Sequence, residues 1–172
     1  YRITRLLGCG GFGMVYEAHH VHMSRAVALK VLDVPRDRVD HHEISRRFIQ
    51  EADAASRIAH PNVVTVHDVG FTGPERSPFI AMQLLQGWDL AEEIDDRGAM
   101  EATRALPLLI DCLAGLAEAH AQGIVHRDLK PGNLFLSAPG ADEERLYVVD
   151  FGMACVLEAE SSRITATGQF LG

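Results

Sequence analysis

The sequence IVHRDLKPGNLFL, residues 124–136, places polar side chains between two apolar runs. An ordinary buried strand does not carry such groups, because a charged or amide side chain beside an apolar core is costly unless it finds a partner. The polar members of this stretch are His126, Arg127, Asp128, Lys130 and Asn133. What these groups face has to be found in the rest of the chain.

Composition describes a globular chain and excludes several functions. Of the 172 residues, 47% are hydrophobic and 23% are charged, which is typical of a folded protein. This length fits one ordinary domain or two small lobes that share a cleft. The formal net charge of −8 argues against a nucleic-acid backbone or an anionic membrane as the main partner.

Cysteine spacing and hydropathy indicate the compartment. Cys9, Cys112 and Cys155 form no CxxC pair, so we expect a reducing, cytoplasmic location without a disulfide framework or a zinc site. No apolar run reaches membrane-spanning length, and no signal sequence opens the chain. Because the chain starts at Tyr1 and stops at Gly172 in a loop-like segment, we interpret it as an excerpt. Its parent protein could still be membrane-anchored through another segment.

The first half of the chain has the alternation of a β-sheet, interrupted by one helical segment. Apolar residues recur at helical spacing from about Glu43 to Ile58, and Pro61 follows. Strand patterns occur at residues 1–20 (on both sides of a glycine-rich turn), 24–34, 62–71 and 78–85. We therefore expect a β-rich lobe with one helix.

After Gly87 the pattern becomes mainly helical. The segment from Leu106 to Ala121 predicts a helix, and Pro107 is compatible with it only in the first turn. Residues 133–137 and 145–150 then predict a hairpin. The apolar stripe expected on the helix consists of Leu109, Leu113, Leu116 and Ala117.

Gly8, Gly10 and Gly13 form a GxGxxG motif, which alone is a weak signal. Such glycines let a backbone approach phosphates and adopt dihedral angles closed to other residues. A dinucleotide-binding fold would need a helix to begin at the third glycine. A strand pattern with the β-branched Val15 follows instead, which argues against that fold.

Two charged groups could join this loop. Lys30 lies on a strand with apolar neighbours, and Glu51 lies on the inward stripe of the predicted helix. A Lys–Glu pair of this kind can hold an ammonium group against phosphate oxygens. A lone strand lysine is, however, usually an edge residue, so these two positions do not decide the function.

The opening stretch supplies the decisive groups. Asp128 and Asn133 lie five residues apart on a tight turn, where the carboxylate can accept or orient a hydroxyl proton and the amide oxygen suits Mg²⁺. Lys130 adds positive charge, and Asp150 offers a second oxygen ligand at the end of the hairpin. We therefore expect the polar groups to face a metal ion and a phosphate.

In this order the motifs resemble the eukaryotic-type protein kinase family. The matching segments are the glycine-rich loop with Val15, VALK, Glu51, HPNVV, HRDLKPGN and DFG. HRDLKPxN resembles the serine/threonine branch, and HPNVV, NLFL and Thr165-x-Thr167 resemble bacterial members. The resemblance implies an α+β, two-lobed protein-kinase-like fold. Residues 1–85 would form a β-rich N-lobe with one key helix, and residues 86–172 an incomplete, mainly helical C-lobe truncated within the activation segment.

The resemblance also implies an activity, in which ATP and Mg²⁺ (or Mn²⁺) serve phosphate transfer to serine or threonine of proteins. Asp128 would be the catalytic base with Lys130 beside it, and Asn133 and Asp150 would hold the metal. Lys30, held by Glu51, would contact the α- and β-phosphates. The ATP-binding residues would be Leu7, Gly8, Gly10, Gly13, Val15, Ala28, Lys30, Met82, Gln83, Leu85, Asp89 and Phe135.

Within that set the resemblance assigns separate tasks. Met82 would be the gatekeeper, the backbone of Gln83 and Leu85 would meet the adenine, and Asp89 would meet the ribose. The residues that would sandwich the adenine are Leu7, Val15, Ala28 and Phe135. His126 and Phe151 would stack in an internal spine below Ala55 and Val66.

Three positions depart from the common pattern of the family. Gln83 replaces a frequent glutamate, Phe135 is bulkier than the usual aliphatic residue, and Ala55 is small for its place in the spine. None of these changes removes a catalytic group. Phe135 puts nucleotide affinity in question, and Ala55 leaves less packing for the active arrangement.

The resemblance extends to regulation. Arg127 would pair with a phosphorylated activation loop, with Thr165 and Thr167 as the preferred acceptors, and self-association would serve autophosphorylation. An alternative function is a nucleotide-binding but catalytically weak signalling scaffold. A small-molecule kinase is a further alternative, against which HRDLKPGN argues. We also expect the excerpt alone to be inactive or unstable, because helices that would cover the second lobe lie outside it.

Overall fold

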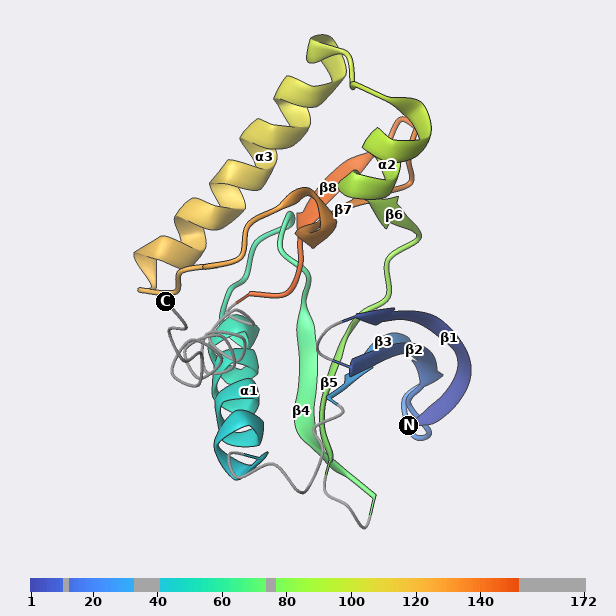
Figure 1. The fold of residues 1–172 in the computed structure, drawn as a ribbon, viewed down its shortest axis with the longest axis vertical. Coiled ribbons are helices and arrows are strands. Elements are labelled where there is room, and N and C mark those ends of the chain that lie inside the picture. Colours follow the sequence, from blue (N-terminus) through green and yellow to red (C-terminus); the bar gives the residue numbers. More distant parts are fainter. Residues whose placement is uncertain (11–12, 33–40, 74–76, 152–172) are drawn as a thin grey trace, which may run out of the picture.

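The computed structural model describes residues 1–10, 13–32, 41–73 and 77–151, which form two lobes (Figure 1). The first lobe holds an antiparallel sheet with strand order β1-β2-β3-β5-β4. Its elements are β1 (Arg2–Gly10), β2 (Gly13–His19), β3 (Ala26–Val31), α1 (His41–Ser56), β4 (Val66–Thr72) and β5 (Ser77–Gln83). The predicted β-rich lobe with one helix is confirmed for the described residues, and α1 begins and ends slightly earlier than predicted.

The central strand β3 is buried on both faces, which explains its nearly continuous apolar sequence. Val27 and Leu29 pack with Ala18 and Ala81 on one face of the sheet. Ala28, on the other face, belongs to the cluster that α1 covers. Lys30 shares that second face because side chains alternate along a strand.

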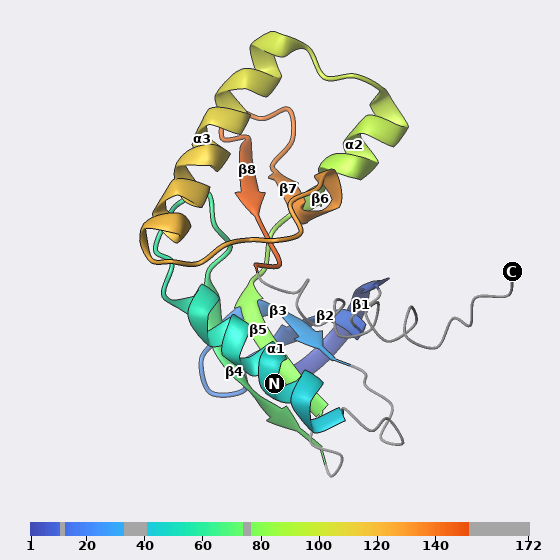
Figure 2. The same cartoon turned by 60° about the vertical axis from the view of Figure 1, so that its left-hand side comes forward.

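Helix α1 packs across this second face of the sheet, as Figures 1 and 2 show from two sides. Its apolar residues at helical spacing, Ile44, Phe48 and Ala52, are buried in the apolar cluster of this face, and the helix contacts β4 and β5. Ala55 lies further along the helix and packs into the core of the second lobe. The helix therefore contributes to both lobes.

The second lobe combines a three-stranded sheet, of order β6-β7-β8, with helices. Its elements are β6 (Gly87–Asp89), α2 (Leu90–Arg97), α3 (Ala102–Ala121), the 3₁₀ turn η1 (Pro131–Asn133), β7 (Leu134–Ser137) and β8 (Arg145–Val148). The hairpin β7–β8 confirms the predicted strand pair. β6 and α2 were not predicted, since each is too short for a reliable periodic pattern.

Helix α3 differs from the prediction in two respects. It starts at Ala102, so Pro107 lies in its second turn, and the expectation of a first-turn proline was wrong. Pro107 and Thr103 are both exposed, so the backbone carbonyl of Thr103, which lacks an N–H partner four residues on, can be hydrated. Most of the predicted stripe was also wrong, because Leu109, Leu113 and Ala117 are exposed, whereas Leu116 is buried as predicted. The buried residues of α3 are Leu108, Cys112, Gly115, Leu116 and Ala119.

The two lobes meet through the segment between α1 and β4. Val63 forms a parallel bridge with Val148, and the side-chain amide of Asn62 donates to the carbonyl of Leu146 at 3.0 Å. This places the segment that follows α1 directly on β8, the strand that leads to Asp150. Within the described residues, no helix has the length and apolar character needed to cross a membrane.

Candidate active site

Residues 124–130 form a tightly held loop between α3 and η1. His126 is buried, its Nε2 lies 2.9 Å from the carbonyl oxygen of Val149, and its ring packs on Phe151 with centroids 4.8 Å apart. Arg127 has φ = 64°, an unusual value for a residue other than glycine. Strained backbone of this kind persists only where its surroundings enforce it, and it is frequent at functional sites.

The carboxylate of Asp128 is bound from two sides. Lys130 Nζ lies 2.7 Å from Asp128 Oδ2, and Asn133 Nδ2 donates to the same oxygen at 3.0 Å. The hydrogen bond from Lys130 is the main cause that lowers the pKa of Asp128, which Asn133 reinforces against the opposing effect of burial. Asp128 is therefore ionised at neutral pH and is oriented by its neighbours.

Asn133 is positioned to offer an oxygen to a cation. Its side-chain nitrogen donates to both the backbone oxygen of Asp128, at 2.7 Å, and the carboxylate. The amide oxygen of this buried side chain takes no part in these two hydrogen bonds. The carbonyl of Asn133 also accepts from the N–H of Val149 at 3.0 Å, which ties η1 to the residue before Asp150.

Asp150, which the sequence predicts as a second oxygen ligand, lies two residues after β8. It has φ = 60°, so two residues of this site other than glycine, Arg127 and Asp150, have left-handed backbone. One carboxylate and one amide oxygen, completed by phosphate oxygens and water, suit Mg²⁺, which is rarely held by protein groups alone. The described residues contain no cluster of three or more His, Cys, Asp or Glu side chains that could hold a metal ion by themselves.

Lys30 reaches this site from the first lobe. Its ammonium nitrogen lies 2.6 Å from Asp150 Oδ2, and its side chain is only 6% exposed. The described residues show no ion pair between Lys30 and Glu51, although both side chains have further interactions. Glu51 lies half-buried on α1. The sequence placed Lys30 and Asp150 at one site but did not predict their direct pairing.

The residues predicted to enclose the adenine divide between the lobes. Ala28 and Met82 are buried neighbours on β3 and β5, and Val15 and Leu85 pack against the same apolar cluster. Phe135 lies on β7 and pairs with Asp89 of β6. Leu7 and Gly8 lie on exposed β1, and Gly10 and Gly13 pair at the open end of β1 and β2.

One backbone group of Gln83 is already hydrogen-bonded within the protein. Its N–H donates to the carbonyl of Thr65 at 2.8 Å, so a ligand would have to use another backbone group at this position. Asp89 caps α2, with Oδ1 accepting from the N–H of Glu92 at 2.9 Å. The other carboxylate oxygen is available to a ligand, because Asp89 is not fully buried.

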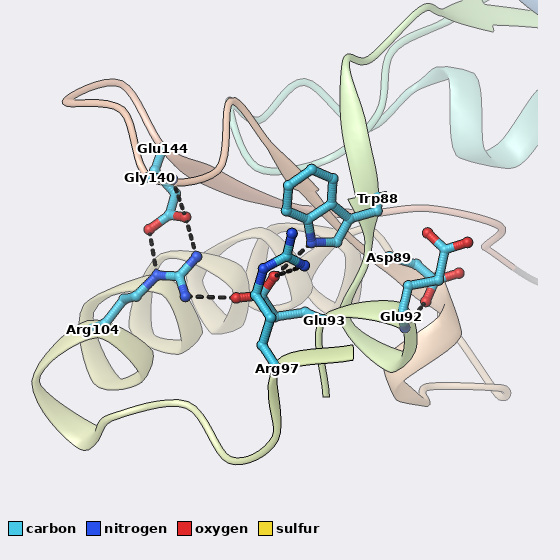
Figure 3. Close-up of polar contacts among 8 residues, drawn as sticks. All are labelled: Trp88, Asp89, Glu92, Glu93, Arg97, Arg104, Gly140 and Glu144. Carbon is cyan, nitrogen blue, oxygen red and sulfur yellow. Dashed lines mark hydrogen bonds and ion pairs between the residues drawn. The ribbon is translucent and has the colours of Figure 1, made fainter. Parts of the chain in front are cut away.

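The sequence missed a buried ionic cluster beside Asp89 (Figure 3). Glu93 on α2 is 2% exposed and accepts hydrogen bonds from Trp88, Arg97 and Arg104. Its acidic neighbours along α2 gave it the appearance of a surface residue. The one sequence signal for its burial was the position of Glu93 four residues before Arg97. Such pairs are common on exposed helices, so the signal was weak.

The predicted regulatory residues are only partly described. Arg127 is exposed on the loop before Asp128, and it has at least one interaction partner. Thr165 and Thr167 lie outside the described residues, as does Gly152 of the DFG motif. Phosphorylation of the two threonines stays a prediction.

A two-lobed fold in which a buried lysine of the sheet meets an aspartate that follows the second hairpin defines the class of protein. The model of the protein kinase domain family matches residues 1–171. The chain belongs to this family, and the two-lobed kinase fold predicted from its motifs is confirmed.

Named relatives are bacterial serine/threonine-protein kinases. PknJ of Mycobacterium tuberculosis is 40% identical over 174 residues, which cover 99% of this chain and 28% of PknJ. PrkC of Bacillus subtilis is 36% identical over 172 residues, which cover 100% of this chain and 25% of PrkC. The crystal structure of the PknI kinase domain of Mycobacterium tuberculosis matches with a TM-score of 0.75 and 33% identity, covering 88% of this chain and 59% of that chain. The chain thus spans about a quarter of the length of these two curated relatives.

Proposed function

We propose that the protein carrying this chain transfers the γ-phosphate of ATP to serine or threonine hydroxyls of proteins. The observation that supports this most strongly is the contact between Lys30 and Asp150, 2.6 Å apart and 120 residues apart in sequence. It joins the first lobe to the segment after β8, which is bonded through Val149 to His126 and Asn133 on either side of Asp128. A phosphate chain lying between the lobes would meet both groups.

Asp128 is the proposed catalytic base. Its ionised carboxylate can accept the proton of a substrate hydroxyl or orient that hydroxyl for attack on the γ-phosphate. Lys130 and Asn133, which bind Asp128 at 2.7 and 3.0 Å, hold the carboxylate in place. Lys130 also supplies positive charge where the transferred phosphoryl group carries negative charge.

Asn133 and Asp150 are the proposed holders of Mg²⁺ or Mn²⁺. When bound, such a cation neutralises charge on the phosphate oxygens. Lys30 would exchange its contact with Asp150 for contacts with the α- and β-phosphates, and Glu51 would then steady it. Gly8, Gly10 and Gly13 would cover the phosphates with backbone groups.

The adenine would lie between the lobes against the apolar cluster of Val15, Ala28, Met82 and Leu85, with Leu7 and Phe135 closing its two sides. Asp89 would accept a hydrogen bond from the ribose. For regulation, we propose that phosphate on Thr165 or Thr167 binds Arg127 and orders the loop, with self-association bringing two copies together for that reaction.

The experiment that tests the proposal measures phosphate transfer from ATP with Mg²⁺ to a generic basic protein. The full-length protein is compared with its Asp128→Asn and Lys30→Met variants. Transfer that both substitutions abolish, with phosphate mapped to Thr165 or Thr167, would support an autoactivating kinase. Tight ATP binding without transfer by the unchanged protein would contradict the proposal and favour a nucleotide-binding scaffold.

A further inference from the structure

The buried ionic cluster of the second lobe joins four separate segments, shown together in Figure 3. We define it as Trp88 of β6, Glu93 and Arg97 of α2, Arg104 of α3, and Glu144 before β8. Arg104 lies at its centre, with Nη1 at 2.6 Å from Glu93 Oε1 and Nε at 2.9 Å from Glu144 Oε2. A second guanidinium nitrogen of Arg104 also donates to Glu144, which makes that pair bidentate.

The carboxylate of Glu93 is fully used by its neighbours. Burial would raise its pKa, but the hydrogen bonds from Arg104 and Trp88, with the charges of Arg104 and Arg97, lower the pKa below its usual value. A buried carboxylate that stays ionised in this way is fixed in one orientation, because any rotation would leave a charge without partners. Glu93 therefore acts as a rigid anchor for the groups that bind it.

Trp88 is the member of the cluster that directly precedes Asp89, the proposed ribose contact. Its indole Nε1–H donates to Glu93 Oε2 at 2.6 Å, and the guanidinium of Arg97 lies over its ring, 4.3 Å from the centroid. The indole nitrogen can only donate a hydrogen bond, and Glu93 is the acceptor of that bond. Arg97 and Glu93 together hold the ring on one side of β6.

Asp89 follows Trp88 and points to the opposite side of β6, as Figure 3 shows and as strand alternation requires. The backbone of β6 is tightly constrained. Gly87 has φ = 147°, and a Cβ built on it would lie 2.0 Å from the carbonyl oxygen of Leu136. Trp88 pairs with Leu136 and Asp89 with Phe135 along β7. Asp89 is also bonded to the N–H of Glu92 in the first turn of α2, at 2.9 Å, and the bond between Trp88 and Glu93 ties that same turn to β6. A shift of this turn relative to β6 would therefore move the Asp89 carboxylate.

We infer that Glu93 is a positioning residue for nucleotide binding, acting through Trp88 to hold the Asp89 carboxylate where it meets the ribose. The inference rests on the proposed function, since it takes Asp89 as the ribose contact. It assigns Glu93 a task beyond stability, because an apolar cluster of similar volume could stabilise the lobe as well as an ion pair does. The chemical group recognised is the ribose 2′-hydroxyl.

The test compares the dissociation constants of ATP and 2′-deoxyATP, measured by calorimetry on the full-length protein. A hydrogen bond from the 2′-hydroxyl to a charged acceptor should favour ATP by about tenfold. Asp89→Asn should reduce this preference to less than about twofold, since it removes the charge. Glu93→Gln should reduce the preference at least about threefold, while the affinity for 2′-deoxyATP changes little.

Two further variants separate positioning from folding. Trp88→Phe removes the indole N–H but keeps an aromatic ring, so it should reduce the preference for ATP even if Glu93→Gln fails to fold. In an Asp89→Asn background, Glu93→Gln should have no further effect on the preference, because residues that act in series are not additive. Glu118→Gln, at a partly exposed position of α3 outside the cluster, is the matched control and should leave the preference unchanged.

Each contrary result has a distinct meaning. A lower melting temperature for Glu93→Gln and Trp88→Phe with an unchanged preference for ATP would overturn the inference and leave the cluster structural. An unchanged protein that binds ATP without preferring it over 2′-deoxyATP would also overturn it, while phosphate transfer would still stand. Absence of any ATP binding by the unchanged protein would instead contradict the proposed function.

Discussion

The two lobes bury charged side chains in different ways. Lys30, in the sheet of the first lobe, has its contact with Asp150 in the other lobe, and Asp150 is itself 28% exposed. Glu93, in the second lobe, finds Trp88, Arg97 and Arg104 within its own lobe. A buried charge that contacts a partly exposed group of the other lobe can exchange that contact for a ligand. A charge enclosed by its own lobe cannot, and it holds structure in place.

This comparison predicts opposite consequences for the two kinds of charge. Substitutions of the charged groups between the lobes should reduce phosphate transfer with little effect on folding. Substitutions in the ionic cluster around Glu93 should mainly reduce the free energy of unfolding. The experiments below test this division, beginning with the largest expected effect.

Asp128→Asn should lower the rate of phosphate transfer by about 10²–10⁴-fold, because the proton acceptor is lost while the shape is kept. ATP affinity and the melting temperature should change little, since Asp128 is partly exposed. Transfer kinetics and thermal unfolding of the full-length protein check this. A rate close to that of the unchanged protein would exclude Asp128 as the base.

Glu93→Ala should lower the free energy of unfolding by about 3–5 kcal/mol, because it leaves Arg104 and Trp88 without their buried acceptor. Denaturant titration measures this change. Glu118→Ala, at a partly exposed position of α3, is the control and should cost less than about 1 kcal/mol. Equal losses for the two variants would contradict the distinction between enclosed and exposed charges.

Lys30→Met should lower phosphate transfer by about 10²–10³-fold, as expected when one charged stabiliser of the reacting phosphates is removed. The free energy of unfolding should stay unchanged or rise by up to about 1 kcal/mol, because a buried ammonium is replaced by an apolar chain and Asp150 can be hydrated. A marked loss of stability would show that Lys30 is structural in the same sense as Glu93.

Glu144→Gln should lower the free energy of unfolding by about 1–2 kcal/mol at pH 7, through loss of the charged acceptor of Arg104. The hydrogen bond from Arg104 is the main cause that lowers the pKa of Glu144 below its usual value of 4.5. Because the folded pKa is the lower one, this stabilisation is complete above about pH 4.5 and is lost as the pH falls through the folded value. Unfolding curves between pH 7 and 3 should therefore show the difference between Glu144→Gln and the unchanged protein shrinking toward acid. A difference that grows toward acid would contradict the ion pair.

Glu17→Gln should change the free energy of unfolding by less than about 0.5 kcal/mol, the smallest effect expected. Glu17 pairs with Arg5 at 2.8 Å, but the Arg5 side chain is 66% exposed. Thermal unfolding at low and high salt checks this. A large, salt-dependent loss would mean that the first lobe also relies on ion pairs for its stability.

Much of the fold was predictable because it depends on local patterns. The alternation of β3 and the helical spacing of α1 identified both elements, and apolar residues at those positions are indeed buried. The start of α3 and its buried face were not predicted correctly. Pro107 suggested a later start, and a helix rich in apolar residues on several sides does not show by itself which face is covered.

The candidate site divides in the same way. The types and order of Lys30, Asp128, Asn133 and Asp150 are properties of the sequence, and they were sufficient to indicate phosphate chemistry and the kinase family. Their mutual contacts required the tertiary structure. The approach of Lys30 to Asp150 depends on how the two lobes pack around residues 60–64 and β8, and no local pattern encodes that packing.

The sequence by itself determined the family, the succession of a β-rich lobe and a mainly helical lobe, and the identity of the reactive groups, because each of these depends on residue type and spacing along the chain. Only the tertiary structure decided which charges are enclosed within one lobe and which lie between the lobes. Glu93 and Glu92 are adjacent glutamates on one short helix, yet one is buried among arginines and the other is exposed. Burial depends on what α3 and the turn before β8 place next to the helix, and that is set by the packing of distant segments.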